Sequence, residues 1–322
     1  GGIINSFNSN AQLGKGEYLI AEADESDKSF LLLQPSISVI TNIEPDHLIN
    51  YENSFSNLKN AFLEFVKCLP FNGISIVCGD DAVIRELKTN FQRPHISYGF
   101  DLDNDYVISE YSSDGSKSTF KMTYDAGSID FKLNMLGRHN VLNAAAAAIL
   151  CLQEGIAVEV IQESLEDFMG IDRRMQILGK REINKHSCIY IDDYGHHPTE
   201  IERTIEAIKD SYPGHKLVMV FQPHRYTRTK DLYNEFVNVL GKVDNLLLME
   251  IYSAGEKVIE GINSTSLKNS IVESGFQSVD LLQDNQMVFQ NISQKINSDT
   301  VFILQGAGDI SLISKQIQDE IL

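Results

Sequence analysis

Four residues that carry or can carry positive charge gather in one short stretch of an acidic chain: His224, Arg225, Arg228 and Lys230. They follow an apolar run that ends at Phe221, so we expect them between a strand and the start of a helix. A helix N-terminus attracts anions through its backbone N–H groups and its dipole, and arginine adds charge-assisted hydrogen bonds. The stretch therefore predicts a site for an anionic ligand.

Two adjacent histidines, His196 and His197, follow another apolar run, directly after Asp192 and Asp193. Neighbouring histidines rarely bind one tetrahedral metal ion, and no third ligand has the required spacing, so the pair does not indicate a zinc site. In an open α/β sheet, ligands bind at the carboxyl ends of the strands, which is where this stretch is expected. The pair is therefore a candidate for contact with a ligand other than zinc.

Acidic residues follow two earlier apolar runs. Glu22 opens the stretch EADESD, and the stretch TNIEPDH contains Asn42, Glu44, Asp46 and His47. Carboxylate and amide oxygens suit Mg²⁺. Each stretch taken alone is explained more simply as a solvated acidic turn, and a lone His47 as a structural residue. Because both turns are expected at strand ends of one sheet, they can converge on a single ion.

Asn140 and Asn143 lie three residues apart at the start of an Ala-rich segment, so their amides share one face of the expected helix. Two amides there can hydrogen-bond to one flat ligand, although an N-cap role also explains Asn140. Farther along the chain, Arg173 and Arg174 stand where we expect one domain to join the next. An arginine at such a hinge can reach a phosphate, and the alternative is an ordinary surface ion pair.

The elements that must position these residues indicate an α/β protein. A chain of 322 residues exceeds one comfortable core, so we expect two domains, 1–174 and 175–322. The first begins with strands and helices, and then changes to short antiparallel strands; we expect strands at 18–21, 37–41 and 74–78, helices at 54–68 and 80–88, and the antiparallel strands between 98 and 133. In the second, strands alternate with helices, which predicts a Rossmann-like, mostly parallel sheet covered on both faces. Its strands are expected at 189–191, 217–221, 246–249, 278–282 and 301–304.

Composition excludes several classes of function. Against 45 Asp and Glu the chain has 27 Lys and Arg, a formal net charge of −18, which disfavours binding to nucleic acid or to anionic membranes. No apolar run approaches the ~20 residues that a membrane span requires. The four cysteines form no CxxC pair, which favours a reducing cytoplasm. Gly306 and Gly308 match only part of a dinucleotide fingerprint, so a nicotinamide dehydrogenase is a distant alternative.

Six stretches resemble, in order, the motifs of the Mur ligases of peptidoglycan synthesis, and of the alanine-adding members in particular: EADESD, TNIEPDH, GRHNVLNAAAA, DDYGHHPTE, FQPHRYTRT and LQGAGDI. The resemblance implies the later part of a central ATP-binding domain followed by a C-terminal Rossmann-like domain. It also implies an N-terminal UDP-binding domain and a phosphate-binding GxxGK[ST] loop upstream. Gly14-Lys15-Gly16 does not match that loop, so we expect residues 1–322 to be inactive alone.

The resemblance also implies a role for each candidate residue. The Mg²⁺ ligands correspond to Glu22 and His47. The contacts with the adenine of ATP correspond to His139, Asn140 and Asn143. The arginine that approaches the nucleotide phosphates from across the domains corresponds to Arg174, and the nucleotide contact of the C-terminal domain to Asp192 or Asp193. The groups that face the muramyl substrate and the amino acid correspond to His196, His197, Arg225 and Arg228.

The implied reaction joins L-alanine to UDP-N-acetylmuramate at the expense of ATP with Mg²⁺, through an acyl phosphate. Phe62 stands about where other Mur ligases carry a modified lysine, which favours the alanine-adding member. Two alternatives stay open. One is a murein peptide ligase, which attaches a recycled tripeptide to the same nucleotide sugar, and the other is a non-catalytic nucleotide-binding module.

Overall fold

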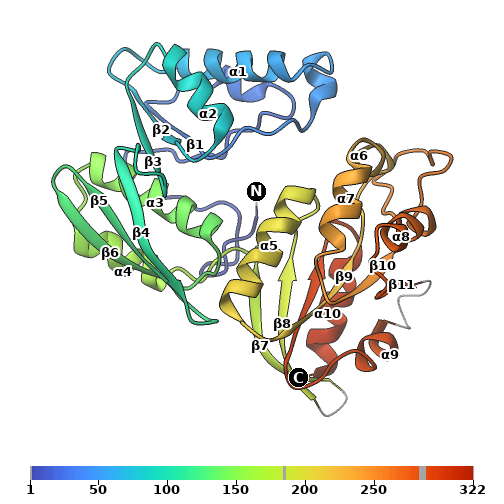
Figure 1. Cartoon of the computed structure of the whole chain (residues 1–322). Coiled ribbons are helices and arrows are strands. Elements are labelled where there is room, and N and C mark those ends of the chain that lie inside the picture. The colour runs from blue at the N-terminus through green and yellow to red at the C-terminus, as the bar shows by residue number, and fades with distance from the viewer. Residues whose placement is uncertain (1, 184–185, 283–287, 322) are drawn as a thin grey trace.

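The computed structural model describes residues 2–183, 186–282 and 288–321. It contains two six-stranded sheets, one formed by the first half of the chain and one by the second (Figure 1). The predicted α/β class is confirmed, since both sheets are mixed, mostly parallel and covered by helices. No described helix combines the length and the apolar character that a bilayer crossing requires.

The first sheet runs in chain order, and its strands are β1 (Ile37–Ile40), β2 (Ile74–Cys78), β3 (His95–Gly99), β4 (Tyr106–Ser113), β5 (Ser118–Tyr124) and β6 (Gly127–Leu133). Strands β1 to β4 pair in parallel, and β4 to β6 form an antiparallel meander. Most residues of β2 are buried on both faces, as expected within a parallel sheet, whereas β6 alternates between buried and exposed residues. The antiparallel strands predicted between 98 and 133 are therefore present.

Four α-helices accompany this sheet: α1 (Phe55–Lys67), α2 (Ala82–Leu87), α3 (Arg138–Gln153) and α4 (Val158–Asp167). Ser54 caps α1 by accepting the N–H of Asn57 at 3.3 Å, and Asp81 caps α2 by accepting the N–H of Ile84 at 2.8 Å. Helix α3 packs against β2, β3 and β5, and α4 packs against β6. The short helices η1 (Ser29–Leu32), η2 (Leu48–Tyr51) and η3 (Lys88–Asn90) complete this half.

The second sheet has the strand order β11-β10-β9-β12-β8-β7. Its strands are β7 (Gln176–Ile183), β8 (His186–Asp193), β9 (Lys216–Phe221), β10 (Asn245–Met249), β11 (Val279–Leu282) and β12 (Thr300–Gln305). All its pairings are parallel except that between β7 and β8. Its helices are α5 (Pro198–Ser211), α6 (Tyr226–Asp231), α7 (Tyr233–Leu240), α8 (Ser264–Glu273), α9 (Val288–Ser293) and α10 (Ile310–Ile321).

Two separate hydrophobic clusters show that this sheet is covered on both faces. Ile191 of β8 and Met219 of β9 belong to the cluster that also contains buried residues of α5, α7 and α8. Their neighbours Tyr190 and Val218 belong to the other cluster, with buried residues of α9 and α10. Successive residues of a strand point to opposite faces, so helices must lie on both sides. This is the layered arrangement predicted from the alternation of strands and helices.

One predicted strand, 18–21, is wrong. No strand forms there, and Tyr18, Leu19 and Ile20 are exposed to 70, 93 and 88%. In the described part of the chain, β1 pairs only with β2, and residues 18–21 pair with no strand. An apolar run becomes a strand only when a neighbour satisfies its backbone groups, and the segment has no such neighbour. The predicted domain boundary at residue 174 lies between α4 and β7.

Candidate functional site

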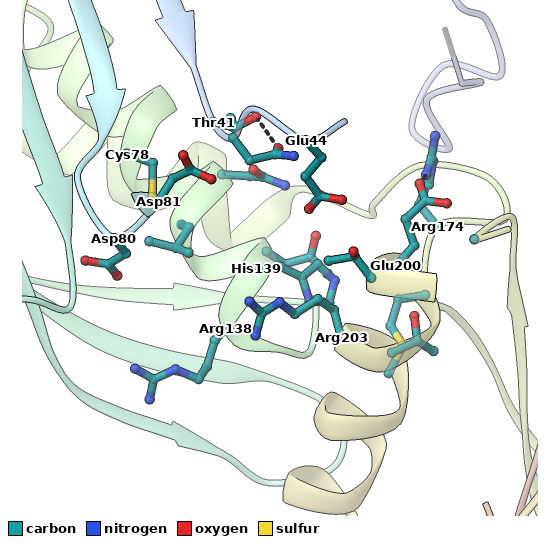
Figure 2. A pocket seen from close by; sticks show the side chains of 18 of the residues that line it. Thr41, Glu44, Cys78, Asp80, Asp81, Arg138, His139, Arg174, Glu200 and Arg203 are labelled. Carbon is teal, nitrogen blue, oxygen red and sulfur yellow. Dashed lines mark hydrogen bonds and ion pairs between the residues drawn. The ribbon is translucent and has the colours of Figure 1, made fainter. Parts of the chain in front are cut away.

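A cavity of about 990 Å³ is lined by residues from both halves of the chain (Figure 2). The first half contributes Glu22, Glu25 and the turns after β1 and β2. The start of α3, the connection between α4 and β7, and the start of α5 complete the wall. Glu44, which follows β1, and Glu200, on α5, approach the cavity from opposite halves of the molecule. The site is therefore built from segments that are far apart in the sequence.

The turn after β2 contributes two aspartates that the sequence analysis did not single out. Asp80 accepts the backbone N–H groups of Phe100 at 2.7 Å and Asp101 at 3.0 Å, and Asp81 caps α2. Both line the cavity because parallel strands bring their carboxyl ends to one edge of the sheet. The sequence signal was a Gly-Asp-Asp turn directly after a buried strand.

Four residues with side-chain oxygens are among those that line the cavity: Glu22, Glu25, Asn42 and Glu44. Mg²⁺ usually takes one or two carboxylates together with water and phosphate oxygens, so these residue types suit it. His47 lies outside the lining; its Nε2 is 3.5 Å from an oxygen of Asp46. Among the described residues, no three His, Cys, Asp or Glu side chains form a group that could hold a metal ion. The pairing of Glu22 with His47 stays a prediction.

The two asparagines of α3 differ in their surroundings although both line the cavity. Asn140 is buried, and its Nδ2 donates to the carbonyl of Leu136 at 2.8 Å. Asn143 is exposed. Gly137, with φ of 93°, opens the helix, and a Cβ at this position would lie 2.7 Å from the ring of His139. Asn143 is therefore the amide that is open to a ligand, and Asn140 also holds the start of the helix.

His139 lines the same part of the cavity. Burial lowers the pKa of His139 to about 4, and the nearby Arg203 and Arg174 act in the same direction. The ring is therefore neutral at pH 7. A neutral imidazole beside an exposed amide suits an uncharged aromatic ligand better than an anion.

The two arginines after α4 point to different partners. Arg174 lines the cavity, its Nη1 is 3.3 Å from Oε1 of Glu200, and its guanidinium lies 5.2 Å from the centre of the Tyr194 ring. Arg173 donates from Nε to Asp192 at 3.1 Å and from Nη2 to the carbonyl of Gly306 at 2.6 Å. Arg174 is thus placed to meet a ligand, whereas Arg173 ties the connection to the second sheet.

The adjacent aspartates at the end of β8 are both buried. Asp193 accepts hydrogen bonds from the Met175 N–H at 3.0 Å, the Thr204 hydroxyl at 2.8 Å and the Gln305 amide at 2.8 Å. Burial raises the pKa of Asp193, although these hydrogen bonds favour its ionised form. Asp193 lines the cavity and Asp192 does not. Both carboxylates hold protein groups in this structure, and their predicted contact with nucleotide stays a prediction.

A second group of side chains adjoins the cavity, and we call it the histidine–arginine cluster: His196, His197, His224 and Arg228. The ring centres of His196 and His224 are 5.5 Å apart, and Nη1 of Arg228 is 3.4 Å from Nδ1 of His224. His197 Nε2 and Arg228 Nε are buried and have no hydrogen-bond partner among the residues that the structure describes. Buried polar atoms are normally paired, so these two atoms indicate a place where a ligand completes the site.

The turn after β1 connects this cluster to the first half of the chain. Oε2 of Glu44 is 3.5 Å from Nδ1 of His197, and Oδ2 of Asp46 is 3.5 Å from Nη2 of Arg228. Arg225 is exposed at the start of α6, with φ of 72°, and its backbone N–H donates to the carbonyl of Tyr252 at 2.8 Å. The structure thus brings His196, His197 and Arg228 together and leaves Arg225 exposed.

Comparison with protein families accounts for both halves of the chain. The model of the Mur ligase middle domain matches residues 4–151, and that of the Mur ligase, glutamate ligase domain, matches residues 173–308. The chain belongs to the Mur ligase family. The family predicted from the six sequence motifs is thereby confirmed. Members of this family are amide ligases.

Three solved structures illustrate how this Mur ligase chain compares with its relatives. UDP-N-acetylmuramate–alanine ligase MurC from Thermotoga maritima is 26% identical with a TM-score of 0.80, and the match covers 99% of this chain and 67% of that one. MurF ligase from Thermotoga maritima, in complex with ADP, is 16% identical with a TM-score of 0.68, covering 89% and 63%. Murein peptide ligase Mpl from Psychrobacter arcticus is 20% identical with a TM-score of 0.60, covering 91% and 58%. The last two likenesses concern the fold alone.

Proposed function

We propose that this chain carries the nucleotide and amino-acid sites of a cytoplasmic, ATP-dependent ligase that joins L-alanine to the lactyl carboxylate of UDP-N-acetylmuramate. One observation supports this most directly. Glu44 and Glu200 line the cavity and also contact His197 and His196, so the cavity and the histidine–arginine cluster are contiguous. A reaction between a nucleotide phosphate and a carboxylate needs two such adjoining sites.

The residues fit the chemistry of carboxylate activation. A carboxylate oxygen is a poor leaving group, and transfer of a phosphoryl group from ATP converts it into an acyl phosphate that an amine can attack. Bound Mg²⁺ would neutralise phosphate charge beside Glu22 and Glu44. Arg174, Arg225 and Arg228 add positive charge in a chain whose formal net charge is −18. Positioning and charge neutralisation therefore carry the reaction, and no side chain is required as a covalent nucleophile.

The choice of alanine rests on two observations. The matched MurC structure is named as an alanine ligase and aligns with 99% of this chain. Phe62, at the position where the resemblance places a modified lysine in other members, packs its ring against Phe30 with centres 5.3 Å apart. A lysine derivative at this half-buried position would lose that ring contact. The four cysteines are free thiols, which supports a reducing cytoplasm.

A chimera tests this proposal. In the chimera, residues 1–322 replace the two thirds of Thermotoga maritima MurC that they match, so that the remaining third supplies the UDP-binding domain and phosphate loop implied by the resemblance. We expect phosphate release from ATP that depends on both UDP-N-acetylmuramate and L-alanine, with formation of the amide. Residues 1–322 alone should release none. Turnover by residues 1–322 alone would show that our reading of the phosphate loop is wrong.

The same chimera distinguishes the alternatives. A murein peptide ligase would use the recycled tripeptide in preference to free L-alanine, and a murein peptide ligase, Mpl, is among the similar structures. We expect higher kcat/KM with L-alanine. A folded chimera that binds ATP and UDP-N-acetylmuramate but forms no amide with either acceptor would favour a non-catalytic module.

A further inference from the structure

Two histidine rings of the histidine–arginine cluster are held in opposite tautomers. Nδ1 of His196 is 3.1 Å from the carbonyl oxygen of Tyr194. A carbonyl only accepts, so Nδ1 carries the proton and Nε2 of His196 keeps its lone pair. Nδ1 of His224 is 3.4 Å from Nη1 of Arg228. A guanidinium only donates, so Nδ1 of His224 carries the lone pair and the proton lies on Nε2.

Neighbouring side chains hold each of the two rings in its orientation. The Tyr194 ring meets His196 edge-on, with centres 5.4 Å apart at 87°. Glu200 lies 3.7 Å from Nδ1 of His196, and the backbone N–H groups of His196 and His197 hold its Oε2 at 2.8 and 3.0 Å. A carboxylate fixed next to Nδ1–H both preserves this tautomer and stabilises the ring once Nε2 gains a proton.

The ring of His224 is stacked on that of Tyr252, with centres 5.5 Å apart at 17°. The position of Tyr252 requires Gly308, because a Cβ there would lie 2.8 Å from Cβ of Tyr252. His224 thus cannot turn to offer its lone pair elsewhere while Arg228 and Tyr252 hold it. The nitrogen that His224 can offer to a ligand is therefore Nε2, which would donate its N–H to a negatively charged oxygen.

Burial favours the neutral form of both rings, so the tautomers matter. Burial lowers the pKa of His196, with Arg228 and Arg174 acting in the same direction and Glu200 opposing them. Burial likewise lowers the pKa of His224 to about 4, assisted by His196, Arg228 and Arg225 and opposed by Glu256. No hydrogen bond within the described residues occupies Nε2 of His196, whose side chain is 17% exposed.

We propose that Nε2 of His196 is the general base that takes a proton from the ammonium group of the incoming amino acid, an inference that rests on the proposed function. The amine nitrogen then attacks the carbonyl carbon of the acyl phosphate, and a C–N bond forms. The C–O bond to phosphate breaks with its electron pair. The second amine proton leaves with the phosphate, and His196 returns its proton to solvent.

The other two histidines of the cluster are poorer bases in this geometry. The lone pair on Nδ1 of His224 already accepts a hydrogen bond from Arg228. His197 accepts the N–H of Thr199 at Nδ1, at 3.3 Å, as the N-cap of α5, and its Nε2 is buried. His196 is therefore the member of the cluster that combines an open lone pair with a carboxylate behind the ring.

Nuclear magnetic resonance of residues 1–322 tests the tautomers without relying on activity. Long-range ¹H–¹⁵N spectra of chain labelled with ¹⁵N-histidine, recorded near pH 7, distinguish Nδ1–H from Nε2–H rings. We expect the Nδ1–H pattern for His196 and the Nε2–H pattern for His224. His196→Gln and His224→Gln assign the signals by the loss of one ring each. An Nε2–H pattern for His196, or a charged ring, would overturn the proposal.

Kinetics of the chimera test the catalytic role. With His196→Gln, kcat should fall about 100-fold or more with little change in KM for L-alanine, and the loss should shrink as the pH rises past the pKa of the free amine. With His224→Gln, KM for L-alanine should rise, and the dependence of the rate on pH should keep its acidic limb. Equal losses in both variants at every pH would contradict a base role for His196. Should the chimera form no amide at all, the proposed function fails, and the spectra still decide the tautomers.

Discussion

At the scale of single residues, the structure separates side chains of one type that the sequence could not tell apart. Arg173 and Arg174 are neighbours, yet one is tied to Asp192 and the other lines the cavity. The sequence identified the right residue types at strand ends, because the carboxyl edge of a parallel sheet is fixed by topology. It could not identify partners such as Glu200, since partners depend on how distant segments meet.

Because of His139, the free energy of unfolding of the chain should decrease as the pH falls. Its pKa is about 4 in the folded chain and about 6.5 when unfolded. Between these values only the unfolded state binds the proton, so the free energy of unfolding should decline as pH falls from about 7 towards 4, by up to about 3 kcal/mol, and stay flat above pH 7. Urea unfolding at a series of pH values measures this slope.

His139→Gln should make that slope shallower, whereas the exposed His95 offers a matched control whose replacement by Gln should leave it unchanged. A slope that is identical in all three proteins would show that His139 titrates normally in the folded state.

At the scale of elements, the start of α3 performs two tasks. Asn140 closes the helix start by its hydrogen bond to Leu136, and Asn143 is open to the cavity. Asn140→Ala should therefore lower the free energy of unfolding of residues 1–322 by about 1–2 kcal/mol, because it removes a buried hydrogen bond. Asn143→Ala should change it by less than about 0.5 kcal/mol.

In the chimera, KM for ATP should distinguish the same two asparagine variants. Asn143→Ala is expected to raise KM for ATP about tenfold, the loss of one good hydrogen-bonding partner. If Asn143→Ala destabilised the chain while KM for ATP stayed the same, the amide would be structural and the adenine assignment would be wrong.

The sequence correctly predicted strands that are fully buried. It was less informative for segments whose structure depends on whether another strand pairs with them. The strands at 217–221 and 301–304 are buried on both faces, and a continuous apolar run is enough to find them. Residues 18–21 show the same kind of run and form no strand, since hydrophobicity does not report a pairing partner. Strand β7 is polar and irregular, with a register shift between Ile177 and Gly179, and no periodicity marked it.

At the scale of the whole molecule, two side-chain contacts join the turn after β1 to the second half: the ion pair of Asp46 with Arg228, and the approach of Glu44 to His197 at 3.5 Å. Arg228 is only 9% exposed on its side chain, so this contact is better protected from solvent than a surface pair. Asp46→Asn should weaken the connection by about 1 kcal/mol and make the relative arrangement of the halves more variable.

Small-angle scattering of residues 1–322 measures this effect as a larger radius of gyration in Asp46→Asn, and high salt should move the parent chain in the same direction. Lys67→Gln removes a surface pair with Glu64 inside the first half and serves as the control. An unchanged scattering profile for Asp46→Asn would show that other contacts hold the halves together.

The outer edge of β1 has a consequence for handling the protein. In the described residues β1 has a neighbour on one side only, Val39 on it is 38% exposed, and the apolar residues Leu19 and Ile20 lie exposed earlier in the chain. An uncovered edge with apolar residues favours self-association. Like charges oppose it, and salt weakens their repulsion. Light scattering should therefore detect oligomers of residues 1–322 as ionic strength rises, and Val39→Lys should suppress them.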